Sequence, residues 1–222
     1  MWRLGHSTAP LDYVPRRFVS WRHRFDDPQR EYRTLYCAVE RITCLREVLG
    51  DVSPNIRAIA EFQEVFGTAS EHILTAGVVS WAWRKANALA PGRIATHEDL
   101  VDVDDVLVRR RLERQHAALL VEYGMEHLYI SEVRSTQRPV TQRIGRALYE
   151  EGAAGVFYKS NRDDLVCAAL FEGAAHLEPD GPVERMTAAF PELLQVCDEY
   201  NLILRGPPGG DSFQQTRSQT GV

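Results

Sequence analysis

Arg24, Tyr36 and Glu47 are three residues whose chemical types could together bind and polarise a charged substrate. The arginine carries a planar, permanently charged guanidinium that matches anionic oxygens with two parallel hydrogen bonds. The tyrosine offers a flat aromatic face, and the glutamate can place negative charge beside a developing cation. Because they stand at intervals of twelve and eleven residues on three successive predicted elements, we expect them to form one wall of an active site.

The elements that must position these residues follow from the local pattern. Asp26, Asp27 and Pro28 break the chain directly after Arg24 and Phe25. Residues 32–39 then alternate as a strand does. One face of this strand, predicted to point toward the core, carries Leu35, Cys37 and Val39. The other face, predicted to point away from the core, carries Tyr32, Thr34 and Tyr36.

From Glu40 the pattern becomes helical, and Gly50 is available as the stop. The predicted apolar stripe of this helix consists of Ile42, Leu45, Val48 and Leu49. Glu47 falls roughly opposite that stripe at 100° per residue. An acidic residue in this position is commonly part of a solvated helix face, so periodicity alone leaves both interpretations of Glu47 open.

A polar turn at Ser160, Asn161 and Arg162 follows the predicted strand from Gly155 to Tyr158. Turns at strand ends often present catalytic side chains on a rigid scaffold, although Ser-Asn is also an ordinary turn signal. Ser160 lies outside any G-x-S-x-G arrangement, which makes it a poor candidate for an acyl-enzyme nucleophile.

Several blocks of the chain resemble, in this order, the RES-domain family. They are SWRHRFDDP, YRTLYCAVERITCLREVL, RPVTQRIGRALYEEGAAGVFYKSN and AALFEG. The arginine, glutamate and serine that give the family its name match Arg24, Glu47 and Ser160. The resemblance runs from about Trp2 to Gly173, and residues 51–133 contribute little to it. A glycine-rich lead found before the arginine in many members is replaced here by SWRH.

The resemblance implies a chemistry, since RES-domain proteins are similar to ADP-ribosyltransferases and act on NAD⁺. Loss of nicotinamide from the ribose passes through an oxocarbenium-like transition state. Arg24 would hold the pyrophosphate, Tyr36 would face the nicotinamide, and Glu47 would place charge near the ribosyl cation. Ser160, with Asn161 beside it, would orient either the nicotinamide end of the substrate or the catalytic glutamate. In relatives a basic residue near the first strand helps to hold the dinucleotide; Arg3 is the nearest match, and His6 is a weaker one.

Composition favours one globular domain, which we place at residues 1–204, followed by a flexible tail at 205–222 that is rich in Pro, Gly, Ser and Gln. A net charge of −5 argues against a nucleic-acid-binding protein. The chain shows neither a signal-peptide pattern nor an apolar run of membrane-spanning length, so we expect a cytoplasmic protein. The four cysteines lack metal-site spacing and should be reduced core residues, and we expect no metal.

The predicted fold is a mixed α/β (α+β) domain with a split sheet flanked by helices, as similarity to ADP-ribosyltransferases implies. Its strands are expected at Trp2–Leu4, Arg33–Val39, His127–Val133 and Gly155–Tyr158. Helices are expected at Pro54–Phe66 and at Val106–Tyr123, where Gly124 ends the second helix. A further helix is expected after a cap at Ser135 or Thr136. The apolar stripe of this last helix consists of Val140, Ile144, Ala147 and Leu148. Leu165–Phe171 and Pro191–Leu204 are each compatible with helix or strand. The stretch from Ile73 to Asp105, including Pro91-Gly92, is predicted to be peripheral packing.

The function that the resemblance implies is an NAD⁺-consuming toxin of a toxin–antitoxin system, neutralised by an Xre-like helix-turn-helix antitoxin. The acceptor of the ADP-ribose, whether phosphate, water or a protein side chain, stays open, as does a homodimer. Two other classes are weighed against this one. A binding module would bind NAD⁺ without releasing nicotinamide, and a regulatory nucleic-acid binder would need a basic face.

Overall fold

The computed structural model describes residues 1–53, 77–134 and 138–207. Its strands are β1 Trp2–His6, β2 Thr34–Ala38, β3 Val78–Val79, β4 Asn87–Thr96, β5 Leu100–Asp102, β6 Gly155–Lys159, β7 Val166–Phe171, β8 Ala175–Pro179, β9 Glu184–Arg185 and β10 Ile203–Leu204. Its helices are η1 Arg16–Phe18, α1 Arg41–Leu49, η2 Gly50–Val52, α4 Trp81–Ala86, α5 Val106–Gln115, α6 Ala117–Glu122, α7 Ile130–Arg134, α8 Arg138–Glu150 and α9 Pro191–Glu199.

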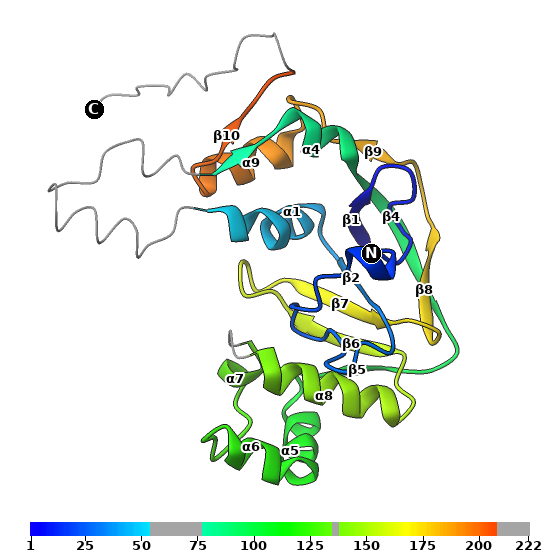
Figure 1. The fold of residues 1–222 in the computed structure, drawn as a ribbon, viewed down its shortest axis with the longest axis vertical. Helices are drawn as coiled ribbons and strands as arrows, with labels where there is room; N and C mark the ends of the chain where they lie inside the picture. The colour runs from blue at the N-terminus through cyan, green and yellow to red at the C-terminus, as the bar shows by residue number, and fades with distance from the viewer. Residues whose placement is uncertain (54–76, 135–137, 208–222) are drawn as a thin grey trace, which may run out of the picture.

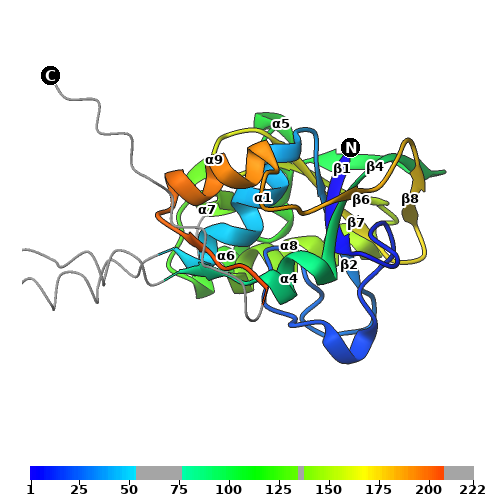
Figure 2. The ribbon, with the colours of Figure 1, turned by 90° about the horizontal axis from the view of Figure 1, so that it is seen from above.

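A mixed sheet in the order β5-β6-β7-β2-β1-β4-β8 organises the molecule, with β9 also paired to β4. Helices α5 to α8 gather beside β5 and β6, whereas α1, α4 and α9 gather toward the β1 and β4 side (Figure 1). Helix α9 lies alongside α1 in both orientations (Figures 1 and 2). The predicted mixed α/β class is confirmed.

The sheet is divided between β1 and β2. These neighbours are joined through one residue pair, Trp2 with Ala38. By contrast, β2 pairs with β7 from Thr34 to Ala38, and β1 pairs with β4 along the whole of β1. The predicted split therefore lies directly beside the strand that carries Tyr36.

Strand β4 corrects the prediction that this stretch is peripheral. It lies inside the large sheet and pairs with β1 over residues 87–91 and with β8 over residues 92–96. Pro91-Gly92, a turn signal in the sequence, marks the point where the strand exchanges one partner for the other. Proline lacks the amide hydrogen of a continuous ladder, so it is tolerated where pairing changes.

Two predictions about residues 106–133 were wrong. Residues 127–133 were expected to form a strand, but α7 is a helix in which Ile130 and Val133 follow helical spacing. The single helix expected at 106–123 is two helices, because His116 leaves helical geometry at φ −117° and ψ 26°. Gly124 ends α6 with φ +69°, a conformation that glycine adopts without a steric penalty.

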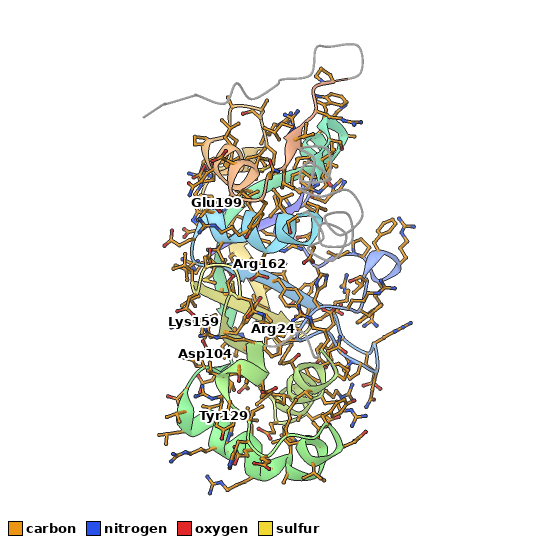
Figure 3. The ribbon with its side chains drawn as sticks, turned by 90° about the vertical axis from the view of Figure 1, so that its left-hand side faces the viewer. Arg24, Asp104, Tyr129, Lys159, Arg162 and Glu199 are labelled. Carbon is orange, nitrogen blue, oxygen red and sulfur yellow. The ribbon has the colours of Figure 1, made fainter. Side chains whose placement is uncertain are left out.

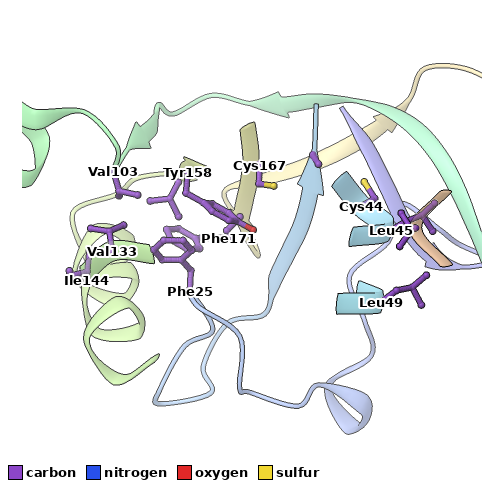
Figure 4. Packing of buried hydrophobic residues seen from close by; sticks show 14 of the residues in the cluster. Phe25, Cys44, Leu45, Leu49, Val103, Val133, Ile144, Tyr158, Cys167 and Phe171 are labelled. Carbon is purple, nitrogen blue, oxygen red and sulfur yellow. The ribbon is translucent and has the colours of Figure 1, made fainter. Parts of the chain in front are cut away.

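A continuous apolar core runs across the sheet. On the α8 side, Phe25 packs against the ring of Tyr158, with 5.2 Å between the ring centroids, and Val133 and Ile144 lie close to them (Figure 4). At the opposite end of the same core cluster lie Cys44, Leu45 and Leu49 of α1 (Figure 4). The predicted stripe of α8 is buried at Val140, Ile144 and Leu148.

The alternation predicted for residues 32–39 holds only inside β2. Leu35 and Cys37 are buried on one face, as predicted. Tyr36 lies on the opposite face, but the expectation that it points away from the core was wrong, because this face packs against the larger core cluster. Tyr32 was expected to point away from the core, but it is buried and stacks on Tyr149 with 3.9 Å between the centroids. Val39 was expected to be buried but is exposed, because the strand ends at Ala38.

The segments that the sequence left compatible with helix or strand are assigned by the structure. Residues 165–171 form strand β7 from Val166, and the segment from Pro191 is first helix α9 and then strand β10. All four cysteines are buried free thiols. The helix expected at 54–66, the cap at Ser135 or Thr136 and residues 208–222 of the predicted tail lie outside the described residues. Within the described ranges, no helix is both long and apolar enough to cross a bilayer.

Candidate active site

The loop that carries Arg24 is shaped by two buried aspartates. Asp27 accepts hydrogen bonds from the backbone N–H groups of Gln29 (3.1 Å) and Glu31 (2.6 Å), which closes the turn around Pro28. Arg146 of α8 approaches the same carboxylate at 3.3 Å. Asp26 accepts from the backbone N–H of His23 at 2.8 Å. Satisfied buried carboxylates of this kind hold a loop in one conformation.

Tyr36 connects this loop to β2. Its hydroxyl donates to Asp26 Oδ1 at 3.1 Å and accepts the backbone N–H of Phe25 at 3.0 Å. The ring of His23 meets the ring of Tyr36 edge-on, with 5.5 Å between the centroids. Burial, and then the nearby Asp26 carboxylate, raise the pKa of Tyr36 well above its usual value. Tyr36 is therefore a neutral phenol that holds Phe25 and Asp26, the two residues that follow Arg24.

Arg24 is nearly enclosed, with 6 % of its surface exposed. Its guanidinium donates to the carbonyl oxygen of Lys159 at 3.3 Å and lies over the ring of Tyr158, 5.0 Å from the centroid. Figure 3 shows Arg24 near Lys159, with Arg162 and Asp104 on the same face of the molecule. Among the described residues, Nε of Arg24 has no hydrogen-bond partner.

Glu47 lies in the electrostatic field of this arginine. Burial lowers the pKa of Arg24, whereas the negative charges of Tyr158, when ionised, and of Glu47 oppose that shift. The Glu47 carboxylate likewise adds to the effect of burial in raising the pKa of Tyr158 and of Cys167. Arg24 lies over the ring of Tyr158, and Glu47 is near enough to influence the charge of both, so we call these three residues the Arg24–Glu47 cluster.

The face of α1 differs from the predicted one. The helix buries Thr43, Cys44, Leu45 and Leu49. Val48, assigned to the apolar stripe, is exposed, whereas Glu47 is half-buried. Oε1 of Glu47 is enclosed and makes no hydrogen bond to any residue that the structure describes. The carboxylate is therefore not part of a fully solvated helix face.

Ser160 stands at the end of β6 and closes a tight turn. Its backbone N–H donates to the carbonyl of Leu165 at 2.9 Å, and its Oγ accepts the N–H of Arg162 at 3.0 Å. The residue is almost fully buried. Because a hydroxyl both donates and accepts, this arrangement uses its acceptor side and leaves its hydrogen to be donated.

The turn of Ser160 is tied to the helix of Glu47. Asp163 accepts the hydroxyl of Thr43 at 2.8 Å and a guanidinium N–H of Arg46 at 3.2 Å, both from α1. Arg162 reaches Asp51 at 2.8 Å, just past the end of α1. Gly50 leaves room for it, since a Cβ there would lie 2.6 Å from the guanidinium carbon of Arg162. These contacts set the position of Ser160 relative to Glu47.

Three residues from the predicted set have other surroundings. Arg3 is buried and donates to the carbonyl of Pro10, and the titratable groups near it are Cys37, Cys44, Asp12 and Tyr13 rather than those of the Arg24–Glu47 cluster. His6 is exposed and contacts Thr8 at 2.9 Å. Asn161 donates its side-chain amide to the carbonyl of Arg134. The structure thus brings together Arg24, Tyr36, Glu47 and Ser160, but not Arg3 or His6.

Sequence reasoning missed three participants. Tyr158 was predicted only as the end of a strand, yet the guanidinium of Arg24 lies over its ring. Asp26 was predicted only to interrupt secondary structure, although a doubled aspartate before proline also predicts a turn capped by side-chain hydrogen bonds. Arg138, the first residue of α8, lowers the pKa of Arg24 further through its like charge. Nothing in the local sequence marks Arg138, because its position relative to Arg24 depends on tertiary packing.

The RES domain family matches residues 1–189 of the chain, which is most of its length. The chain belongs to the RES-domain family. The resemblance seen in its arginine, glutamate and serine blocks is thereby confirmed at the level of the family. No curated protein matches.

One solved structure is similar to this RES domain. It is entitled "Crystal structure of the M.tuberculosis MbcT-MbcA toxin-antitoxin complex" and shares 17 % sequence identity. The match covers 86 % of each chain with a TM-score of 0.46.

The cluster in this RES domain combines features suited to a substrate that is anionic at one end and develops positive charge at another. Arg24, with Arg138 nearby, provides cationic charge, and Glu47 provides a partly desolvated carboxylate. Among the described residues, no group of three or more His, Cys, Asp or Glu side chains is arranged to hold a metal ion.

Proposed function

We propose that this RES-domain protein is an NAD⁺-consuming toxin of a toxin–antitoxin system. In the proposed reaction the bond between C1 of the ribose and nicotinamide breaks, and nicotinamide leaves with the bonding electron pair. A C1–O bond then forms to phosphate or water, and that acceptor loses a proton. The observation that carries the proposal is the enclosed Arg24–Glu47 cluster in a chain of this family.

The roles follow from charge and geometry. Arg24 would bind the pyrophosphate through the guanidinium edge that has no partner among the described residues. Glu47 would stabilise the cationic ribose, and its enclosure strengthens that interaction because the effective dielectric is low there. Tyr158 presents an aromatic wall beside Arg24. Ser160 would orient the nicotinamide end of the substrate through its free hydroxyl hydrogen, with Asn161 next to it.

Two parts of the proposal concern the surroundings of the enzyme. The partner that we propose is an Xre-like antitoxin, which would have to block access to the Arg24–Glu47 cluster. The protein is proposed to act in the cytoplasm, where NAD⁺ is available, as a single domain at residues 1–204.

The decisive experiment compares Glu47→Gln with the unmodified protein. NAD⁺ consumption should fall about 100-fold, the scale observed when one preorganised electrostatic group is removed. The variant should remain folded, with the unfolding free energy lowered by no more than about 1–3 kcal/mol, since the amide deprives no described residue of a hydrogen bond but removes a carboxylate that favours the charge of the buried Arg24. Glu40→Gln is the matched control, because Glu40 is exposed at the start of the same helix.

Mass spectrometry of the products, with and without added phosphate, identifies the acceptor. Phosphorolysis gives phosphorylated ADP-ribose, hydrolysis gives free ADP-ribose, and transfer to protein adds the mass of ADP-ribose to a polypeptide. Turnover by Glu47→Gln at the parental rate would remove Glu47 from the mechanism. Binding of NAD⁺ without release of nicotinamide by the unmodified protein would support a binding module instead.

A further inference from the structure

A pocket of about 630 Å³ lies beside α4, and α4 is far from helices α5 to α8 in Figure 1. It is formed where α4, the end of β1, the segment after β9 and the chain leaving β10 converge, in the upper part of Figure 1. Backbone contacts fix this junction: Ser7 donates to the carbonyl of Ala86, and Arg205 donates to the carbonyl of Val79. The pocket shares no lining residue with the Arg24–Glu47 cluster.

The lining is cationic. It includes Arg84, Lys85 and Arg185 and contains neither Asp nor Glu. Within the described part of the chain, none of these three side chains has an ion-pair partner, whereas Arg33, Arg46 and Arg146 are each paired with a carboxylate. Three cations around one concavity without an ion-pair partner among the described residues are unusual in a chain of net charge −5.

Arg84 is the innermost of the three. It is 6 % exposed, and its one described side-chain hydrogen bond is from a terminal nitrogen to the carbonyl of Arg205 at 2.7 Å. Its Nε is buried and has no partner among the residues that the structure describes. An enclosed guanidinium without a carboxylate is costly, and an anion entering the pocket would relieve that cost.

The remaining walls indicate the kind of anion. Ser7, Thr8 and Thr187 bring hydroxyl groups, which donate to oxygen acceptors. Trp81 brings an indole ring, with the Lys85 ammonium 5.1 Å from its centroid. Two guanidiniums, an ammonium and hydroxyls suit the several oxygens of a phosphate group. The volume is that of a small-molecule site.

We propose that this pocket is a second binding site, which takes the phosphate or pyrophosphate group of a small anionic ligand through Arg84, Lys85 and Arg185. The site is independent of the chemistry proposed for the Arg24–Glu47 cluster.

The test uses the full-length protein with pyrophosphate as the probe, titrated calorimetrically at low ionic strength, since salt screens such contacts. The variants are Lys85→Ala combined with Arg185→Ala, both near the surface of the pocket, and Arg93→Ala as control. Arg93 is an exposed cation of β4 that is paired with Glu178 and lies outside the pocket. All proteins also carry Arg24→Lys and Glu47→Gln, so that the first cluster contributes equally to each titration.

We expect the double substitution to weaken pyrophosphate binding at least tenfold and Arg93→Ala to change it less than twofold. Binding should also change the fluorescence of Trp81, and this signal should be absent in Trp81→Phe. Parallel titrations with inorganic phosphate and ADP-ribose separate the sources: tighter binding of ADP-ribose assigns a nucleotide-like ligand, and equal binding assigns free phosphate.

Equal pyrophosphate affinity in the double variant and the control would overturn the proposal, and so would binding of an acidic peptide but not of pyrophosphate. NAD⁺ turnover is measured separately with Arg24 and Glu47 intact. Lys85→Ala with Arg185→Ala should leave it within twofold. Loss of the proposed enzymatic function and loss of this binding site are therefore distinguishable.

Discussion

Tyr36 was expected to act through its flat face, but the structure uses its hydroxyl as well. That group donates to Asp26 and accepts from the backbone of Phe25, and both partners are almost wholly buried. The hydroxyl therefore holds the residue next to Arg24 in place. At the scale of single residues, the two hydrogen bonds of the Tyr36 hydroxyl link this side chain to the position of Arg24.

Tyr36→Phe tests this link. Removal of the hydroxyl leaves a buried carboxylate oxygen and a buried backbone N–H with one partner fewer, so the unfolding free energy should fall by about 1–3 kcal/mol. Urea denaturation measures the change. Tyr129→Phe is the matched control, because Tyr129 is exposed and its loss should cost less than about 0.5 kcal/mol. Equal stability of the two variants would show that the hydroxyl does not hold the loop.

Helix α1 and the turn after β6 form one unit at the scale of elements. They are distant in the sequence, yet Asp163 receives hydrogen bonds from Thr43 and Arg46 of α1 and from Leu165 of its own turn. Arg46 is in turn held by Glu199 of α9 at 2.6 Å. Glu47 and Ser160 thus take their relative position from side chains that would not contact substrate.

Thr43→Val should weaken this unit without opening a cavity, since valine has nearly the same shape. Loss of one hydrogen bond should cost about 0.5–1.5 kcal/mol, which corresponds to a fall in Tm of about 2–4 °C per kcal/mol in a chain of this size. Differential scanning calorimetry measures the effect. Thr187→Val, at an exposed site where no hydrogen bond of the hydroxyl to a described residue is seen, should leave Tm nearly unchanged. A Tm for Thr43→Val equal to that of the parent would mean that the contact with Asp163 contributes nothing.

The whole molecule carries four internal reporters of its folding, one cysteine each in β2, α1, β7 and α9. Burial raises the pKa of Cys37 and of Cys44 to about 12 and that of Cys197 to about 11. It raises the pKa of Cys167 as well. Neutral, enclosed thiols are poor nucleophiles, so their reactivity should depend on opening of the core.

An aromatic disulfide reagent at pH 8 should therefore label no thiol rapidly in the folded protein and all four in denaturant. The same shifts predict a pH dependence. Because each thiol binds its proton more tightly when folded, this contribution to stability is complete below the ordinary thiol pKa of about 8.5 and is lost as pH rises toward the raised values. Urea midpoints at pH 8 and pH 10 measure it. Rapid labelling of the native protein would show that a thiol is accessible.

The sequence by itself determined the family and the local elements around the site. The strand at Tyr36, the helix of Glu47 and the turn at Ser160 follow from patterns of neighbouring residues, and these patterns survive because the period of a strand or helix is a local property. The buried stripe of α8 was predictable for the same reason.

Only the tertiary structure decided which of these residues meet. The central place of β4, despite its Pro91-Gly92 signal, depends on β1 and β8, which lie far away in the chain. The enclosure of Glu47, the placement of Tyr158 under Arg24 and the surroundings of Arg3 all result from long-range packing. Local propensity carries no information about such contacts, since their free energy arises from burial and charge between segments brought together by folding.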